Sequence, residues 1–170
     1  DDEASLALAS GTFDTALRPW IIGPFDNDQG KGFDVVYPPE RTGIVPETAK
    51  GSVAEVGWRR APVIDPTGAV LLNRLIKPVS WQTAYAQSEF ELSETQDCEL
   101  RISSSDPLKV WVDGVLVYQD RTLGGYTLDN VFVPLSLERG RHRVLVKTMN
   151  QSGRWTLRMR LTGQRNAALK

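Results

Sequence analysis

Hydrophobic and polar residues alternate along four stretches in the second half of the chain. These stretches are residues 81–92, 98–103, 131–137 and 154–161. Because successive side chains of a strand point to opposite faces, a period of two predicts strands with one buried face. Glycine, serine and aspartate residues separate the stretches, as turns between short strands require. Pro134 cannot donate a backbone hydrogen bond, which predicts an edge strand or a bulge at that point.

Residues 108–120, LKVWVDGVLVYQD, predict a tight hairpin. Two runs of β-branched and aromatic residues flank Asp113 and Gly114, and an Asp-Gly pair in that setting is the strongest local signal for a two-residue turn. Both residue types tolerate the positive φ of a type I′ turn. The turn therefore also sets the register of the two strands.

The hydrophobic runs of the first half are shorter and predict three strands, at residues 20–25, 33–37 and 53–63. Residues 70–76 fit either a short helix or a buried connection. Strands that recur with turn signals between them are typical of a sandwich, and closing eight or nine antiparallel strands into two sheets gives a jelly roll. The predicted fold class is therefore an all-β, antiparallel β-sandwich of jelly-roll type.

The length and composition fit one ordinary globular domain. With 170 residues, the chain is long enough for a sizeable core and too short for two typical domains. We expect a leader at residues 1–19 that is partly helical or flexible, one domain at 20–163 and a tail at 164–170. The net charge of -1 gives no electrostatic footprint for nucleic acid or an anionic membrane, so neither partner is expected. Cys98 is the only cysteine and is expected to be a buried strand residue.

The order of motifs between residues 81 and 162 resembles a known fold. Its segments are AYA at 84–86, VWVDG at 110–114, VLVKTMNQSG at 144–153 and WTLRMRL at 155–161. This order is similar to the galactose-binding-domain-like jelly roll, as in the sugar-binding domain of family 2 glycoside hydrolases. There the hairpin commonly carries Asn where this chain has Asp113.

The segments WIIGPFDN, GFDVVYPPE and GWRR, between residues 20 and 60, resemble a second set of proteins. They are similar to jelly-roll modules of large bacterial multidomain proteins with helical-repeat or transglutaminase-like regions. The two resemblances imply a non-catalytic accessory module of a larger bacterial protein, either carbohydrate-binding or an interaction domain. They are weak guides to function, because such modules often serve as structural domains.

The loop from residue 26 to residue 34, DNDQGKGFD, is a candidate metal site. Asp26, Asp28 and Asp34 offer carboxylates around two glycines, and a calcium ion needs several oxygen ligands from a tightly turning backbone. The resemblance adds to this hypothesis, since jelly-roll carbohydrate modules often carry a structural calcium. However, Gly30 and Tyr37 stand where an EF-hand loop needs further oxygen ligands. The alternative is an uncharged turn with Asx-type hydrogen bonds and no cofactor at all.

Three aromatic residues are candidates for ligand binding. Trp81, Tyr85 and Trp111 lie on the polar-side phase of their strands, and exposed rings stack on the apolar faces of sugars. Asp113 and Arg121 are polar neighbours that would bind hydroxyl groups, as would Gln87. The alternative is that these rings pack beneath residues 20–63, which must cover some part of the sandwich.

A polar set in the loop at residues 119–130 is the other candidate, with Arg121, Tyr126 and Asp129 as its members. Loops at the ends of a sandwich often bind ligands, although a simple crossover explains this loop equally. His142 is the only histidine, and no nucleophile motif, Walker motif or dinucleotide motif is present.

Three functional hypotheses follow. The first is a non-catalytic module that binds carbohydrate or neighbouring domains of its parent chain. The second is a purely structural domain that packs against its neighbours and binds no small ligand. The third is a glycan-active enzyme on a jelly-roll scaffold.

Overall fold

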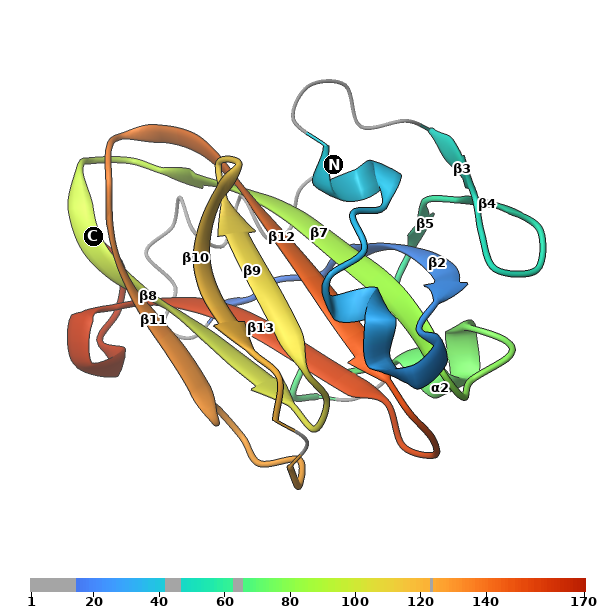
Figure 1. Cartoon of the computed structure of the whole chain (residues 1–170). Helices are drawn as coiled ribbons and strands as arrows, with labels where there is room; N and C mark the ends of the chain where they lie inside the picture. The colour runs from blue at the N-terminus through green and yellow to red at the C-terminus, as the bar shows by residue number, and fades with distance from the viewer. Residues whose placement is uncertain (1–14, 42–46, 63–65, 123) are drawn as a thin grey trace.

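Two antiparallel sheets pack face to face in the computed structural model, which describes residues 15–41, 47–62, 66–122 and 124–170 (Figure 1). The first sheet has the order β1-β13-β8-β11, with β6 also paired to β13. Its strands are β1 (Thr15–Ala16), β6 (Val70–Leu71), β8 (Gln96–Ser104), β11 (Val131–Leu137) and β13 (Thr156–Gly163). This sandwich confirms the predicted all-β jelly-roll class.

The second sheet has the order β10-β9-β12-β7-β2-β5 and carries the candidate site. Its strands are β2 (Trp20–Asp26), β5 (Arg59–Arg60), β7 (Gln82–Leu92), β9 (Leu108–Val112), β10 (Val115–Asp120) and β12 (Gly140–Asn150). A separate hairpin pairs β3 (Thr48–Lys50) with β4 (Glu55–Gly57). The short helical elements are η1 (Asp28–Phe33), η2 (Pro38–Glu40), α2 (Leu72–Leu75) and η3 (Gln164–Asn166). None of the helices in the described part of the chain is long and apolar enough to cross a bilayer.

The main core lies between the two sheets and follows the predicted alternation. Residues such as Leu100, Val110, Val146 and Leu157 are almost fully buried in it. Cys98 is buried there too, and burial raises the pKa of its thiol to about 11, so it is a core residue rather than a reactive one. The core also includes Leu17 and Leu169, which lie near the two ends of the described chain.

The hairpin at β9 and β10 forms as predicted. Asp113 has φ 51° and Gly114 has φ 81°, which are the two left-handed residues of a type I′ turn. The turn is tied to β12 through two contacts of Asp113 with Arg143. The Asp113 backbone N–H donates to the Arg143 carbonyl at 2.9 Å, and the Arg143 N–H donates to Asp113 Oδ1 at 2.9 Å.

Residues 27–41, here called the covering segment, cross the outer face of the second sheet (Figure 1). The strand predicted at 33–37 is wrong: η1 ends at Phe33, and no strand follows before η2. Side chains rather than a backbone ladder hold this stretch. Tyr37 donates its hydroxyl to the Asp26 carbonyl at 2.5 Å and stacks on Phe25 at 4.9 Å.

A second, smaller core lies beneath the covering segment. Its buried members are Ile22, Phe25, Ala49, Tyr85 and Leu145. The second sheet is therefore apolar on both faces over part of its width, which alternation along single strands did not predict. The covering segment leaves a pocket beside it on the outer face of the second sheet.

Other predicted elements are partly confirmed. The strand expected at 53–63 is reduced to β4 and β5, and residue 63 lies outside the described residues. Residues 70–76 contain both a two-residue strand, β6, and the helix α2. β11 is an edge strand, as Pro134 predicted. Of the expected leader, residues 1–14 lie outside the described part of the chain, while β1 pairs with β13.

Candidate functional site

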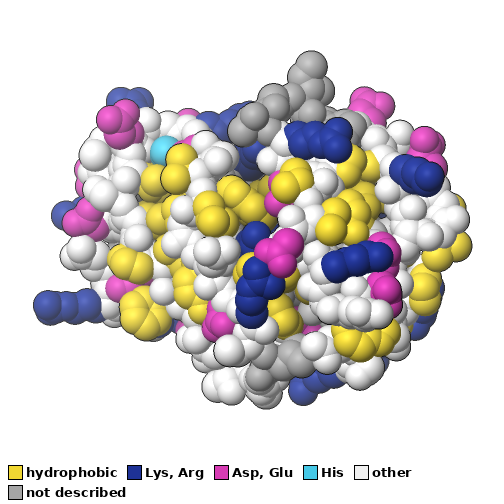
Figure 2. Space-filling view, viewed as in Figure 1, with side chains coloured by type: hydrophobic (Ala, Val, Ile, Leu, Met, Phe, Trp, Pro, Cys, Tyr) yellow, Lys and Arg dark blue, Asp and Glu magenta, His cyan; other side chains and the backbone are white. Residues whose placement is uncertain are grey.

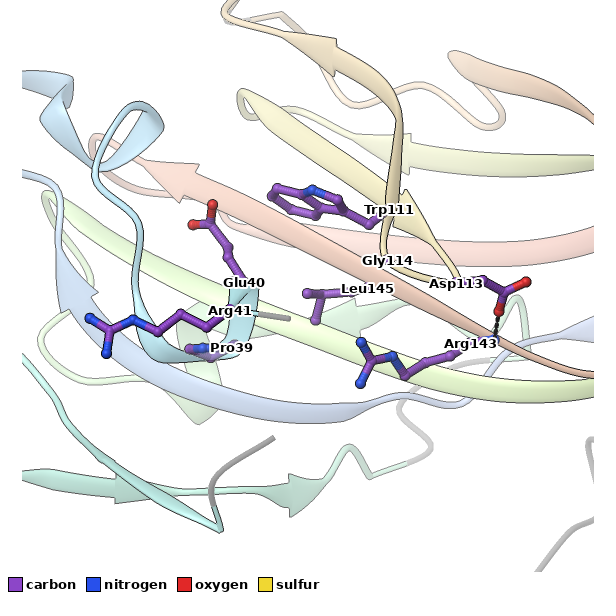
Figure 3. A pocket seen from close by; sticks show the side chains of 8 residues that line it. All are labelled: Pro39, Glu40, Arg41, Trp111, Asp113, Gly114, Arg143 and Leu145. Carbon is purple, nitrogen blue, oxygen red and sulfur yellow. Dashed lines mark hydrogen bonds between the residues drawn. The ribbon is translucent and has the colours of Figure 1, made fainter. Parts of the chain in front are cut away.

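A pocket of about 180 Å³ opens on the outer face of the second sheet, beside the covering segment (Figure 3). The covering segment forms one side of it, the β9–β10 turn forms another, and β12 contributes to the floor. The lining residues are Pro39, Glu40, Arg41, Trp111, Asp113, Gly114, Arg143 and Leu145. Of the residues predicted from the sequence, Trp111 and Asp113 line this pocket.

The register between β9 and its two neighbouring strands brings the apolar side chains of the pocket together. Trp111 on β9 lies directly opposite Leu145 on β12 and directly opposite Leu116 on β10. Directly opposite residues point to the same face of a sheet. Leu145 is buried, Trp111 is half-buried and Leu116 is 43% exposed. A half-buried indole ring therefore lies on the outer face of the sheet, next to Leu145 and Leu116.

The space-filling view shows the same face of the molecule (Figure 2). Hydrophobic side chains gather over β9 and β10, beside the covering segment. Basic and acidic side chains lie next to them across the middle of the face. This face therefore combines apolar surface with charged groups.

Glu40 reaches from the covering segment into a buried polar network. Its Oε1 accepts hydrogen bonds from Lys147 Nζ and from the hydroxyl of Tyr85. The Lys147 side chain is 0% exposed and the Glu40 side chain 7%. Lys147 Nζ also donates to the Val35 carbonyl at 2.7 Å. This network anchors the covering segment to β7 and β12.

The two partners of Glu40 have displaced pKa values. Burial lowers the pKa of Lys147, and Glu40 counteracts this effect. Burial, and then the negative charge of Glu40, raise the pKa of the Tyr85 hydroxyl. Tyr85 therefore stays protonated and keeps donating its hydrogen bond to Glu40.

Asp113 is held by His142. The Nδ1 atom of His142 lies 2.7 Å from Asp113 Oδ2, and its Nε2 lies 2.8 Å from the Glu138 carbonyl oxygen. Burial opposes a charge on the ring, but the two acceptors outweigh it and raise the pKa of His142. The imidazolium then compensates the charge of Asp113. The lone histidine thus has a structural role in fixing the β9–β10 turn to β12.

The other predicted rings do not join this pocket. Tyr85 is 0% exposed beneath the covering segment, so it is not accessible to a ligand here. Its side chain does lie on the outer face of the second sheet, as its phase predicted, but packing by the covering segment buries it. Trp81 precedes β7 at the far end of that strand and is 41% exposed, with φ 55°.

The polar set predicted in the loop at 119–130 is divided among three places. Arg121 pairs with Asp34 and stacks over Phe33 at 3.9 Å. Arg154 lies over the Tyr126 ring at 4.9 Å.

Asp129, the third member, binds arginines of β13 on the other sheet. Arg158 lies 3.2 Å away, and Arg160 Nε lies 3.0 Å away. The hydrogen bond from Arg160 and the positive charges of the neighbouring arginines lower the pKa of Asp129 against the effect of burial. Arg121, Tyr126 and Asp129 therefore do not form one site.

The carboxylates of the predicted calcium loop are bound to other groups. Lys31 Nζ lies 2.6 Å from Asp26 Oδ2, and this hydrogen bond lowers the pKa of Asp26. Asp28 donates its backbone N–H to Asp26 Oδ1 at 2.9 Å, which is an Asx-type turn. Asp34 is bound to Arg121. Within the described ranges, no group of three His, Cys, Asp or Glu residues is arranged to hold a metal. Calcium binding stays a prediction.

A larger hollow of about 540 Å³ lies on the outer face of the first sheet. Its lining residues are Asp97, Cys98, Glu99, Pro134, Leu135, Ser136, Gln164 and Arg165. It contains no aromatic side chain. Asp97 already accepts a hydrogen bond from Gln164 at 3.0 Å, and Glu99 accepts one from the Arg165 N–H at 2.8 Å. The Trp111 pocket is smaller but has the better chemistry for a ligand.

Sequence reasoning missed most of the residues that line the Trp111 pocket. Pro39, Glu40 and Arg41 follow the strand predicted at 33–37, and no local pattern indicates where that segment folds back. Arg143 and Leu145 carry a signal that was not used. They alternate with buried Val144 and Val146 on β12, so they point to the opposite face, as Trp111 does.

The fold is an antiparallel β-sandwich of jelly-roll type, and known structures share it. The chain is similar to an anti-sigma factor domain-containing protein, with 9% identity, 91% of this chain and 45% of that chain covered, and a TM-score of 0.56.

It is also similar to a beta-glucosidase from Kluyveromyces marxianus, with 11% identity, 84% and 16% of the two chains covered, and a TM-score of 0.51. The chain spans less than half of the length of either protein. No family model and no curated protein matches the sequence.

Proposed function

We propose that this chain is a non-catalytic carbohydrate-binding module of a larger bacterial protein, with the Trp111 pocket as its ligand site. The observation that carries the proposal is the half-buried indole of Trp111 on a rigid sheet, next to Leu145 and ringed by charged side chains. Sugar rings have apolar faces and polar edges, and an amphipathic pocket of this kind is complementary to both.

The lining residues favour binding over catalysis. Glycoside hydrolysis needs two carboxyl groups that can exchange protons with a substrate. Glu40 is engaged by Lys147 and Tyr85, and Asp113 by His142 and Arg143. Both pocket carboxylates therefore serve the structure. The similar beta-glucosidase is much longer than this chain, which is compatible with an accessory role for the sandwich.

A glycan array followed by titration calorimetry tests the proposal. Trp111→Ala is expected to weaken binding of the strongest array glycan by about tenfold or more, because the ring contributes most of the accessible apolar surface. Trp81→Ala is the matched control, since it removes an indole outside the pocket. Absence of binding to every glycan, or loss of binding only in Trp81→Ala, would contradict the assignment.

Exposed apolar residues on the edge strands support a second function, docking of a neighbouring domain. Val115 is 64% exposed on β10, and Phe132 is 62% exposed on β11. Edge strands with exposed apolar side chains tend to pair with other chains. Concentration-dependent association in sedimentation velocity that is removed by Phe132→Ser favours this function. A monomer at all concentrations counts against it.

A further inference from the structure

The acidic and the basic side chains of the Trp111 pocket differ in how far other groups of the protein already bind them. Both oxygens of Asp113 are engaged, one by the Arg143 N–H and one by His142. Glu40 is nearly buried and faces Lys147. The negative charges of the pocket are therefore already compensated by groups of the protein.

The two arginines of the pocket differ from the two acids. The guanidinium groups of Arg41 and Arg143 have no hydrogen-bond acceptor or ion-pair partner among the described residues. Arg143 extends along the sheet from β12 toward Pro39, beside Leu145 (Figure 3). Glu89 lies directly opposite Arg143 in the register, but its carboxylate is 3.7 Å from Arg141. The positive charges of the pocket thus remain available.

Resting on the proposed function, we propose that the Trp111 pocket selects saccharides that carry a carboxylate, of the uronic acid type. A guanidinium binds a carboxylate through two parallel hydrogen bonds, and this geometry suits Arg143 at the edge of an apolar floor. The sugar ring packs on Trp111 while its carboxylate meets Arg143.

The volume of the pocket limits how many sugar rings of a saccharide it can hold. Its volume of about 180 Å³ is below the roughly 300–1,000 Å³ of pockets for drug-sized ligands. One sugar ring, at a chain end or on a branch, therefore occupies the pocket. Monosaccharides are accordingly valid probes.

The test compares ligands that differ at one carbon atom. Titration calorimetry at low salt uses galacturonate against galactose, and glucuronate against glucose, so that a carboxylate replaces a hydroxymethyl group. We expect the uronates to bind about ten- to a hundredfold more tightly, as a charge-assisted hydrogen bond allows. The methyl ester of galacturonate keeps the shape, lacks the charge and is expected to bind like galactose. Rising salt should weaken the uronates selectively.

Amino-acid substitutions test whether Arg143 causes the preference for uronates. Arg143→Gln is expected to remove most of the difference in affinity between each uronate and its neutral sugar. Arg139→Gln, in the exposed turn before β12 and outside the pocket, is the matched control and should keep the preference. Glu89→Gln should strengthen uronate binding, because it removes a negative charge opposite Arg143. Circular dichroism confirms that each variant is folded.

The possible failures are distinguishable. Equal binding of galactose and galacturonate, with both weakened by Trp111→Ala, overturns the carboxylate preference and leaves the carbohydrate module in place. Tighter binding of galactose 6-sulfate than of galacturonate also overturns it, in favour of a sulfated sugar. No binding of any saccharide, here or on the array, overturns the proposed function itself.

Discussion

Asp106 provides a direct test of how this sandwich tolerates a buried carboxyl group. It lies in the turn between β8 and β9 and is 7% exposed. Its Oδ2 accepts a hydrogen bond from Ser105 Oγ at 2.9 Å, and its Oδ1 accepts one from Asn150 Nδ2 at 3.1 Å. Burial raises the pKa of Asp106 to about 6, although both hydrogen bonds act in the opposite direction.

The sign of the pH dependence follows from this pKa. The folded state holds the Asp106 proton more tightly than the unfolded state, in which the ordinary pKa of 3.8 applies. The proton therefore stabilises the fold fully below about pH 4, and its contribution is lost as the pH rises through 6. The difference between 3.8 and about 6 corresponds to about 3 kcal/mol at about 1.4 kcal/mol per pKa unit.

The substitution Asp106→Asn keeps the shape of the side chain and a hydrogen-bonding partner for Asn150, and it cannot ionise. The unfolding free energy of the variant minus that of the native protein should rise by about 2 to 3 kcal/mol between pH 4 and pH 7.5. Urea unfolding at several pH values, followed by tryptophan fluorescence, measures this difference. Other titrating groups are common to both proteins and cancel in the comparison.

Glu91→Gln is the control, because it removes one carboxylate from an exposed position on β7. It should show no comparable gain toward neutral pH. A stability difference between Asp106→Asn and the native protein that does not change with pH would refute the reasoning. So would a difference that grows toward acid pH.

Three further predictions concern the anchors of the fold. Lys147→Met should destabilise the protein by about 3–5 kcal/mol, because it leaves the carboxylate of Glu40 buried without its cation. Urea unfolding checks this, and adding Glu40→Gln should recover part of the loss; a fully additive loss contradicts the pairing. His142→Gln should destabilise most at acid pH: the His142 pKa is raised, so the stability from its charge is present below the ordinary pKa of 6.5 and is lost as the pH rises through the folded-state pKa. Thermal unfolding at pH 5.5 and pH 8.5 measures this, and an effect that is equal at both pH values refutes it. Gly114→Ala should cost about 1 kcal/mol because φ is 81° there, whereas Gly125→Ala, in an exposed loop, should be nearly neutral in the same assay.

Particular residues show which parts of the structure the sequence predicts. The hairpin at Asp113 and Gly114 depends on two adjacent residues and their φ angles, so it is fully local and was predicted correctly. The alternation of Leu157, Met159 and Leu161 is equally local, and these residues do form the core. The failed strand at 33–37 has the composition of a strand, but among the residues that the structure describes no strand lies beside it to complete its backbone hydrogen bonds.

The sequence by itself determined the strands of the second half, the main turn and therefore the class of fold, since each follows from residues that are close along the chain. Only the tertiary structure decided the site. Whether Tyr85 is buried and Trp111 is accessible depends on where the covering segment crosses the sheet. That path is fixed by contacts between residues far apart in sequence, such as Glu40 with Lys147 and Asp34 with Arg121. No local periodicity encodes such contacts, because they depend on side chains that meet only after the sheets have formed.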